Sequence, residues 1–381
     1  MKRVRYWRSL EQVSHLSERE RQALAPVAAR YKFRANSYYL KLIDWDDPDD
    51  PIRRIVIPQT AELRSFGHLD ASNEVANYVA PATQHKYAST VLLLCNEVCG
   101  AYCRFCFRKR LFMDENDETA TDLTAGIDYI RRHPEVTNVL LTGGDPLLLS
   151  TRRLEAILRP LSAIPHVRII RIGTKMPAFN PYRILDDPDL VAMLSRYCTA
   201  DKQVYLMTHF NVPQELTEVA VQAITTLRRA GLILANQSPI LRGINDSPER
   251  LAELMRRLAV VGAPAYYFFI CRPTEGNRPF ELPIVDAYHV FTQARRRVSG
   301  LAKRARLVMS HASGKVEVVA VNREYIYLRY HRAKAIEDEE RLVICHRDDS
   351  AYWLDDLVPV TRYPGQIRAF RRPASHIPGP E

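Results

Sequence analysis

The stretch that decides the fold is Val91-Leu92-Leu93-Leu94-Cys95-Asn96-Glu97-Val98-Cys99-Gly100-Ala101-Tyr102-Cys103-Arg104-Phe105-Cys106. Its unbroken apolar run, Val91–Cys95, predicts a buried strand of the kind found in parallel sheets. On the loop that follows, Cys99, Cys103 and Cys106 have the spacing C-x3-C-x2-C. Three thiolates on one short loop suit a [4Fe–4S] cluster, and three ligands leave one iron open. The sequence therefore predicts an iron–sulfur site directly after a buried strand.

A structural zinc site is the alternative for these cysteines. Zinc would need a fourth ligand from a second cluster, and no paired Cys-x2-Cys occurs elsewhere in the chain. Basic residues flank the loop and would favour thiolates by lowering the cysteine pKa; they are Arg104, Arg108, Lys109 and Arg110. Cys95 falls outside the spacing, so we expect it to be a buried strand cysteine. The isolated cysteines are expected to be structural: Cys198, Cys271 and Cys345.

Short apolar runs alternate with amphipathic helical stretches along the chain, a pattern typical of βα units and a parallel sheet. The expected strands are Val91–Cys95, Val136–Leu141, Val167–Ile172, Val204–Met207, Leu232–Ala235 and Tyr266–Cys271. The expected helices are Thr121–Arg132, Arg152–Leu158, Glu215–Ala230 and Pro248–Val261. Six strands are fewer than the eight of a closed barrel, so the count fits either an open partial barrel or a doubly wound sheet.

Three regions are expected: a helical N-terminal region over residues 1–85, a core over 86–300 and a C-terminal extension over 301–381. The elements expected outside the core rhythm are a helix at Ser14–Tyr31, a boundary loop at Asp44–Pro51, a basic helix at Ile284–Val298 and strands at Arg306–Met309 and Tyr325–Tyr330. The tail from Pro364 is rich in Pro and Arg, and little structure is expected there.

Composition limits the class of protein. The 381 residues are 46% hydrophobic and 26% charged, which is ordinary for a soluble globular chain. Lys and Arg number 54 against 44 Asp and Glu, so the net charge of +10 suggests acidic ligands or partners. No apolar run is long enough to span a bilayer, and the basic N-terminus lacks the apolar stretch of a signal peptide. We therefore expect a cytoplasmic protein.

The cysteine loop resembles the signature of radical S-adenosylmethionine (SAM) enzymes, because an aromatic residue precedes the last cysteine. From Tyr39 to Lys315 the chain resembles the lysine 2,3-aminomutase family. The matching stretches include Tyr39–Asp44, Tyr102–Cys106, Leu140–Leu147, Ile164–Val167, Arg171–Thr174, Thr208–Asn211, Asn236–Ser238 and Leu241–Asp246. The resemblance implies an α/β fold, a partial (β/α)6 radical SAM barrel with a helical N-terminal region and a C-terminal extension.

The resemblance also implies how the cluster and SAM are held. Cys99, Cys103 and Cys106 would bind three irons, and the open iron would take SAM. The loop after the second strand would hold the methionine end of SAM; it comprises Thr142, Gly143, Gly144 and Asp145. Glycines allow a backbone to approach a ligand closely. The alternative is a tight turn with Asp145 as a helix cap. His209 and Gln237, expected at the ends of the fourth and fifth strands, resemble further SAM contacts.

Pyridoxal phosphate (PLP) is the third cofactor that the resemblance implies. Gly314-Lys315-Val316 resembles the segment that carries the PLP-binding lysine, and such a lysine forms a Schiff base only when deprotonated. The two arginines that hold the PLP phosphate in the family fall at Lys86 and Thr90. Lys86 keeps one positive charge, whereas Thr90 keeps only a hydroxyl, so the phosphate site is expected to be built differently.

The substrate residues depart most from the family. Arg108 matches the arginine that grips the substrate carboxylate. Arg272 stands where lysine-specific members have an aspartate, and the segment before Lys315 lacks their second acid. These changes favour a substrate with an acidic or neutral side chain, and glutamate is the first candidate. The alternative is that Arg272 turns outward and pairs with Glu275 or Glu281.

The predicted function is a radical SAM, PLP-dependent 2,3-aminomutase that moves an amino group of an amino acid from C2 to C3. The alternatives are an aminomutase-like enzyme that modifies lysine on a translation factor, a radical SAM enzyme without PLP, and an iron–sulfur or zinc protein that binds nucleic acid. We expect a flavodoxin- or ferredoxin-type reductase as electron donor and a homo-oligomer. We expect neither nucleic acid nor a membrane as a partner.

Overall fold

The computed structural model describes residues 4–113 and 116–360, so the expected unstructured tail lies outside the described residues. A twelve-stranded sheet forms the body, in the order β14-β13-β12-β11-β10-β9-β8-β7-β6-β5-β4-β3. Its strands are β3 (Tyr78–Ala80), β4 (Thr83–Tyr87), β5 (Thr90–Asn96), β6 (Asn138–Gly143), β7 (Ile169–Thr174), β8 (Gln203–Thr208), β9 (Ile233–Ile240), β10 (Ala265–Ile270), β11 (Arg306–His311), β12 (Gly314–Val321), β13 (Tyr325–Ala333) and β14 (Leu342–His346). A small separate sheet pairs β1 (Tyr6–Trp7) with β2 (Ala35–Asn36).

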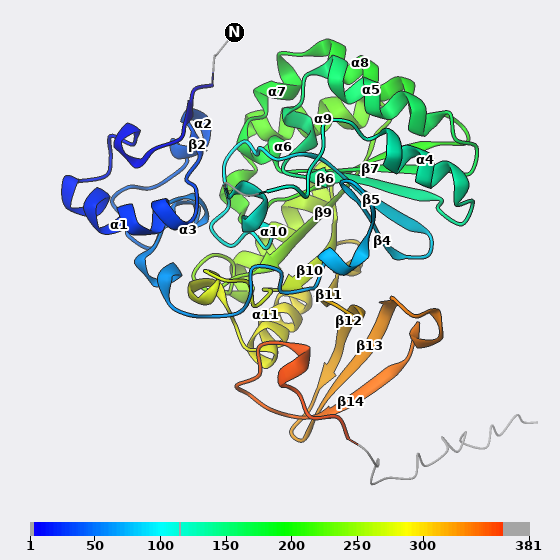
Figure 1. Cartoon of the computed structure of the whole chain (residues 1–381). Coiled ribbons are helices and arrows are strands. Elements are labelled where there is room, and N and C mark those ends of the chain that lie inside the picture. Colours follow the sequence, from blue (N-terminus) through cyan, green and yellow to red (C-terminus); the bar gives the residue numbers. More distant parts are fainter. Residues whose placement is uncertain (1–3, 114–115, 361–381) are drawn as a thin grey trace, which may run out of the picture.

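The six predicted core strands are confirmed as β5 to β10, and each neighbouring pair among them is parallel. Helices follow these strands and cover the outer face of the curved sheet (Figure 1). They are α4 (Thr124–Arg132), α5 (Thr151–Ser162), α6 (Met176–Phe179), α7 (Tyr182–Leu185), α8 (Pro188–Arg196), α9 (Glu218–Arg229), α10 (Pro248–Val261) and α11 (Ile284–Arg296). This is the mostly parallel α/β arrangement that we expected.

Side-chain caps explain where these helices begin. Ser150, Thr217 and Ser247 each accept a hydrogen bond from a backbone amide in the first turn of α5, α9 and α10. Asp187 does the same for α8, a helix that the sequence analysis did not name. An Asp at the cap followed by a Pro at the first helical position was the signal for it.

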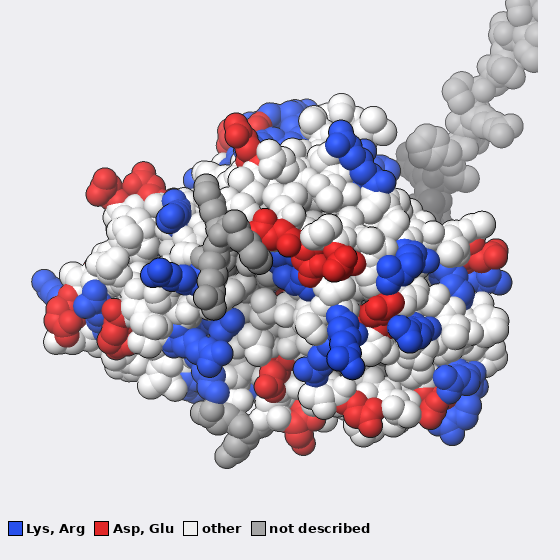
Figure 2. Space-filling view, turned by 90° about the horizontal axis from the view of Figure 1, so that it is seen from above, with Lys and Arg blue, Asp and Glu red and all other residues white. Residues whose placement is uncertain are grey.

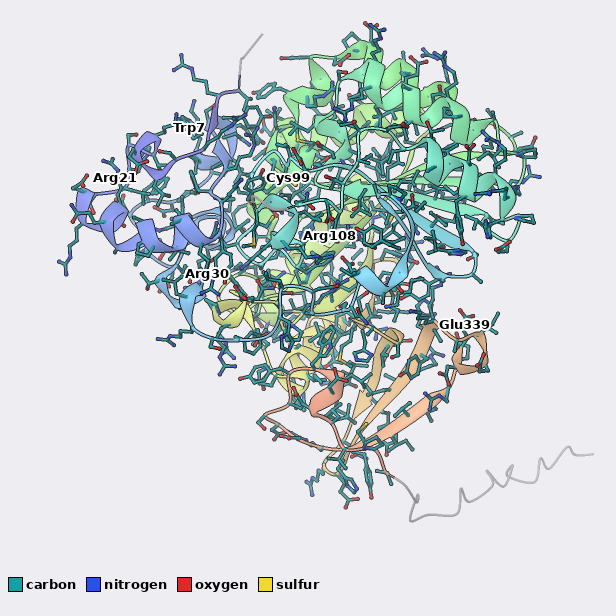
Figure 3. All side chains as sticks on the ribbon, viewed as in Figure 1. Trp7, Arg21, Arg30, Cys99, Arg108 and Glu339 are labelled. Atoms are coloured by element: carbon teal, nitrogen blue, oxygen red, sulfur yellow. The ribbon has the colours of Figure 1, made fainter. Side chains whose placement is uncertain are left out.

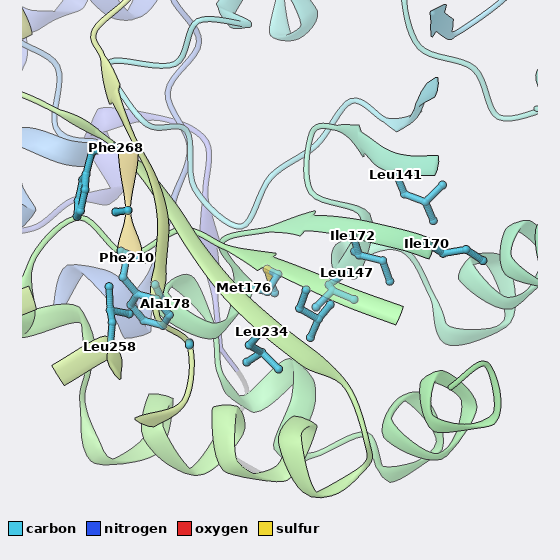
Figure 4. Close-up of a cluster of buried hydrophobic side chains, with 14 of the residues drawn as sticks. Leu141, Leu147, Ile170, Ile172, Met176, Ala178, Phe210, Leu234, Leu258 and Phe268 are labelled. Atoms are coloured by element: carbon cyan, nitrogen blue, oxygen red, sulfur yellow. The ribbon is translucent and has the colours of Figure 1, made fainter. Parts of the chain in front are cut away.

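One continuous apolar core joins the sheet to its helices. This core includes Ile172 and Leu234 from the strands, Leu147 from the turn after β6 and Leu258 from α10 (Figure 4). All four side chains are buried. Because the outward-facing strand residues meet helices, the inward-facing ones remain for a ligand site.

The sheet extends past both expected region boundaries. β11 pairs in parallel with β10, so a seventh parallel strand lies beyond residue 300. β12, β13 and β14 then add antiparallel strands, and Lys315 lies in β12. At the other edge, β4 spans residues 83–87 and thus crosses the expected boundary at residue 85. Long-range strand pairing leaves no local sequence signal, which is why these boundaries differ.

The N-terminal region contains α1 (Glu18–Arg30), α2 (Ser37–Leu40) and α3 (Pro51–Val56), and α1 confirms the helix expected there. Asp50, in the expected boundary loop, caps α3 by accepting from the amide of Arg53 at 2.7 Å. The ring of Tyr39 meets that of Phe179 edge-on at 4.6 Å. The core of the region also includes Val212 and Leu241, which follow β8 and β9. The N-terminal region therefore covers the carboxyl ends of the parallel strands.

Charge is mixed on the outer surface. Lys and Arg side chains are interspersed with Asp and Glu over the face seen in Figure 2, and they do not gather there into one basic patch. None of the helices within the described residues is both long and apolar enough to cross a membrane.

A buried ion pair joins the N-terminal region to the cysteine loop. Arg104 donates from Nε and Nη2 to the two carboxylate oxygens of Glu62, at 3.0 and 2.8 Å. Both side chains are almost fully buried. Lys109 lies 3.7 Å from the same carboxylate. Glu62 is thus the anion that two cations share beneath the loop.

We predict that Glu62→Gln lowers the free energy of unfolding by about 3–5 kcal/mol, because it leaves Arg104 buried without its counter-charge. Urea unfolding followed by circular dichroism measures this change. The control is Glu253→Gln, which removes the exposed pair with Arg256 on α10 and should cost under about 1 kcal/mol. Equal losses for the two variants would contradict the prediction.

Candidate active site

The cysteine loop lies between β5 and α4, at the mouth of the barrel. The N-terminal region holds its backbone: Arg34 Nε donates to the carbonyl of Cys99 at 2.7 Å, and Asn36 Nδ2 donates to that of Gly100 at 3.0 Å. Figure 3 shows Cys99 and Arg108 in the middle of the molecule, between the N-terminal region and the sheet. The loop is therefore fixed from the side opposite the strands.

Burial dominates the electrostatics of the three cysteines. It raises the pKa of Cys103 to about 12, and it raises the pKa of Cys99 and Cys106 as well. The flanking residues Arg108, Lys109 and Arg110 lower the pKa of Cys106, as expected, but burial outweighs them. Metal binding deprotonates a coordinating thiol outright. These thiols are accordingly suited to ligation and poorly suited to acting as free nucleophiles.

In the described part of the chain, no three His, Cys, Asp or Glu side chains converge on a single metal ion. In a four-iron cluster each thiolate binds a different iron, so the three sulfurs need not converge on one point. Cys99, Cys103 and Cys106 thus remain the predicted ligands. Cys95 is confirmed as a buried cysteine of β5, with its thiol 3.6 Å from the carbonyl oxygen of Thr142.

The glycines at the end of β6 allow the backbone there to approach the cysteine loop closely. Gly143 has φ +106°, and a Cβ on Gly144 would lie 2.6 Å from the backbone N and O of Val98. The amide of Gly144 donates to the carbonyl of Asn96 at 2.5 Å. We expected the glycines to admit a ligand; the group that they admit here is protein backbone. Thr142, the residue before them, accepts from Arg108 Nη1 at 2.8 Å.

Asp145 is fully occupied by protein donors. Its carboxylate accepts from the amides of Leu147 and Lys175 at 3.0 and 2.7 Å, and from the hydroxyl of Thr174. Burial raises the pKa of Asp145 to about 6 despite these bonds. The helix-cap alternative is confirmed for Asp145, since it caps the short helix Pro146–Leu148.

His209 follows β8 and has a free ring atom. Burial, then the charge of Lys175, lowers the pKa of His209 well below its ordinary value, so the ring is neutral. Its Nε2 is buried and has no hydrogen-bond partner in the described residues. Buried polar atoms are nearly always paired, so Nε2 fits a ligand such as SAM. Gln237 lies inside β9, opposite Tyr267 of β10, and not at the strand end that we expected.

Lys315 lies among aromatic rings and other cations. Its Nζ is 4.4 Å from the ring centre of Tyr267 and 5.3 Å from that of Phe269. Burial lowers the pKa of Lys315 well below its ordinary value, and nearby cations lower it further; these are Arg171, Arg272, Arg332 and Lys86. The amine is therefore neutral at a pH where an ordinary lysine is charged, which is the state that attacks an aldehyde.

Arg108 and Arg272, the two predicted substrate residues, meet on Glu74. Oε1 of Glu74 lies 3.3 Å from Arg108 Nη2 and 3.4 Å from Arg272 Nη1. Arg110 also donates to this carboxylate, at 2.9 Å. Burial alone would raise the pKa of Glu74, but the three arginines hold it well below its ordinary range. Glu74 lies in a loop without periodicity, so no signal in the sequence pointed to it.

The alternative in which Arg272 turns to the surface is wrong. Its guanidinium stacks 3.8 Å from the ring centre of Phe107, and its carboxylate partner is Glu74. Glu275 instead pairs with Arg30, and Glu281 with Arg278. Arg272 thus faces the same interior as Lys315.

The chain is similar in sequence to known proteins. Residues 94–255 match the Radical SAM superfamily. A protein of Aquifex aeolicus named "Putative L-lysine 2,3-aminomutase" is 50% identical over 356 residues, covering 93% of this chain and 95% of that protein. L-lysine 2,3-aminomutase of Clostridium subterminale is 34% identical, covering 92% of this chain and 83% of that protein.

The chain belongs to the radical SAM lysine 2,3-aminomutase family. Radical SAM enzymes bind a [4Fe–4S] cluster and SAM, which agrees with a cysteine loop beside an unpaired His209 Nε2. The family also includes glutamate 2,3-aminomutase of Clostridioides difficile, which is 31% identical and covers 87% of this chain and 79% of that protein. Its relatives are thus isomerases that are named for different amino acid substrates.

We predict that Cys99→Ala, Cys103→Ala and Cys106→Ala each abolish the cluster, because all three thiolates are needed to hold it. Iron and sulfide analysis of anaerobically purified protein measures the cluster. Cys95→Ala is the matched control, since Cys95 is a buried cysteine on the same segment outside the spacing. Loss of the cluster in Cys95→Ala with retention in Cys99→Ala would contradict the assignment.

Proposed function

We propose that this protein is a PLP-dependent amino acid 2,3-aminomutase whose first candidate substrate is glutamate. The observation that carries the proposal is the inward-facing Arg272 beside a neutral Lys315. Lys315 is suited to the aldehyde of PLP, and Arg272 is suited to a carboxylate on the substrate. Both act on the same interior, because the charge of Arg272 contributes to the low pKa of Lys315.

The chain's own residues would divide the work among them. When bound, the cluster and SAM supply a 5′-deoxyadenosyl radical, and PLP supplies an electron sink for a substrate radical. Cys99, Cys103 and Cys106 would hold the cluster, and His209 Nε2 would meet SAM. Lys315 would hold PLP through its neutral amine. Arg108 would orient the carboxylate next to the migrating amino group.

Arg272 has the donors to bind a second carboxylate. A guanidinium carries five N–H donors, and one of them contacts Glu74 while the plane rests on Phe107. The remaining donors can make the bidentate contact that a carboxylate accepts. A substrate with carboxylates at both ends, such as glutamate, would engage Arg108 at one end and Arg272 at the other.

Glu74 does not provide an anchor for a cationic side chain. Arg108 and Arg272 share its single carboxylate, and Arg110 makes a third contact. An ammonium approaching Glu74 would therefore meet more positive than negative charge. This argues against a lysine substrate, whether free or on a translation factor.

Two partners belong to the proposal. A cluster that passes one electron to SAM must be reduced by a donor, for which a reductase of flavodoxin or ferredoxin type is suited. We also propose a homo-oligomer, as expected from the family resemblance.

We predict that PLP attaches to Lys315. Borohydride reduction of the PLP-loaded protein, followed by peptide mapping, should place the pyridoxyl label on this residue. Lys202→Gln is the matched control, because Lys202 is another lysine of lowered pKa, and its amine is held by the carbonyls of Ile164 and Val167, outside the site. The label should persist on Lys315 in that variant and vanish in Lys315→Gln. A label on another lysine would refute the assignment, and the absence of any label would favour the PLP-free enzyme.

We predict that the wild type converts glutamate and does not convert lysine efficiently. Arg272→Gln should lower kcat/KM for glutamate on the order of 100-fold, because it removes a desolvated charge pair. Arg272→Asp should lose glutamate turnover and gain some lysine turnover. Product analysis with glutamate, aspartate, glutamine, alanine and lysine tests this.

Arg278→Gln is the control for these variants. Arg278 lies six residues further along the same connection, and its side chain is 44% exposed. Its replacement should leave the substrate preference unchanged. Efficient conversion of lysine by the wild type would overturn the substrate proposal.

A further inference from the structure

Apart from Arg272, the basic side chains around Lys315 form no ion pair within the described residues. Lys86, Arg171 and Arg332 all contribute to its lowered pKa. Within residues 4–113 and 116–360, no ion pair joins any of these four side chains to a carboxylate. Their hydrogen bonds go instead to neutral groups, such as the amide oxygen of Asn138 from Arg171 at 2.8 Å. Several cations held together without an anion indicate an anionic ligand.

The sheet places two members of this group opposite each other. Lys315 of β12 and Arg332 of β13 lie directly opposite each other in the antiparallel register. Directly opposite residues share one face of the sheet, and like charges in that position destabilise the pairing. The low pKa of Lys315 removes one of the two charges. An anion bound between β12, β13 and β5 would compensate the charge of Arg332.

Arg332 is aimed at the start of β5. Its Nη1 donates to Thr90 Oγ1 at 3.1 Å and its Nη2 donates to Ser89 Oγ at 3.0 Å. Its guanidinium carbon also lies 4.4 Å from the ring centre of Tyr87. Two hydroxyls and one ring therefore fix the guanidinium, and neutral hydroxyls leave its charge unbalanced. Hydroxyls can in turn donate to an anion that the guanidinium attracts.

Lys86 adds a second cation from β4. Its ammonium donates to the carbonyl of His311, at the end of β11. Burial, then the charge of Arg272, lowers the pKa of Lys86 to about 8, so it is still mostly protonated at neutral pH. An ammonium has three donors, and one is used here. Arg332 and Lys86 together carry about the charge that balances a phosphate monoester near pH 7.

We infer that Arg332, with Lys86 and the hydroxyls of Ser89 and Thr90, forms the site that binds the 5′-phosphate of PLP. This inference rests on the proposed function, because the phosphate belongs to the molecule that attaches to Lys315. A guanidinium matches the geometry of a phosphate through two parallel hydrogen bonds. Arg332 thus supplies from β13 the guanidinium that position 90 lacks on β5. The C-terminal strands thereby take part in holding the cofactor.

The test compares PLP with pyridoxal, which has the same aldehyde and ring but no phosphate. Full-length protein with its cluster loaded is titrated with each, and attachment is followed by the visible absorbance of the lysine-bound pyridoxyl group. The wild type should bind PLP far more tightly than pyridoxal. Arg332→Gln should weaken PLP binding about 10- to 100-fold, the range for a lost hydrogen bond to a charged group, and leave pyridoxal binding unchanged. Arg332→Lys should retain part of the preference.

Arg329→Gln is the matched control. Arg329 lies on the same strand three residues earlier, opposite Glu317 in the register, and it pairs with that carboxylate. This variant should keep the wild-type preference for PLP. If Arg332→Gln does not fold, Thr90→Val removes one hydroxyl that positions the guanidinium, and it should weaken PLP binding selectively.

The outcomes separate this inference from the function on which it rests. Unchanged PLP binding in Arg332→Gln overturns the inference alone. An equal loss of PLP and pyridoxal binding in this variant also overturns it, because such a loss would mean that Arg332 has a structural role. Failure of the wild type to bind PLP at all overturns both. A selective loss for PLP, with cluster content and circular dichroism like the wild type, supports it.

Discussion

Parallel pairing of seven neighbouring strands, β5 to β11, is the constraint on which the site depends. Parallel strands end at the same edge of a sheet, so the loops after them meet in space however far apart they are in sequence. The cysteine loop follows β5, Gly144 follows β6, His209 follows β8 and Arg272 follows β10. The N-terminal region packs over this edge and holds the cysteine loop through Arg34 and Asn36. A helix between successive strands is what allows each strand to return in the same direction.

Positive charge is concentrated where these elements meet. The acids near the mouth are already engaged: Glu62 beneath the cysteine loop, Glu74 between Arg108 and Arg272, and Asp145 among backbone amides. Apart from Arg272, the basic side chains near Lys315 form no ion pair within the described residues. Their mutual repulsion is a cost to the folded protein, and it adds to burial in lowering the pKa of Lys315. The excess of basic residues in the composition therefore has a structural consequence around Lys315.

Gly144 and Asp145, which belong to a recognisable sequence motif, both contact other segments of the protein. Gly144 is required because the backbone of Val98 leaves no room for a Cβ. Asp145, beside it, caps a short helix and joins the loop after β6 to Thr174 and Lys175 after β7. Both residues shape the cofactor site by fixing protein segments to one another. A motif recognised in a sequence can thus serve the site through packing as well as through ligand contact.

The sequence by itself determined the six core strands, the presence of the N-terminal helix and the cysteine spacing. These follow from local patterns: apolar runs, caps and spacings within a few residues. Only the tertiary structure decided that Glu74 bridges Arg108 and Arg272, that β11 extends the parallel sheet, and that Arg332 lies opposite Lys315. The pairing of β12 with β13 contains register shifts near Lys315 and near Val318, so the partner of Lys315 could not be counted from the turn. Contacts between distant segments depend on how strands align and pack, and no spacing in the chain encodes that alignment.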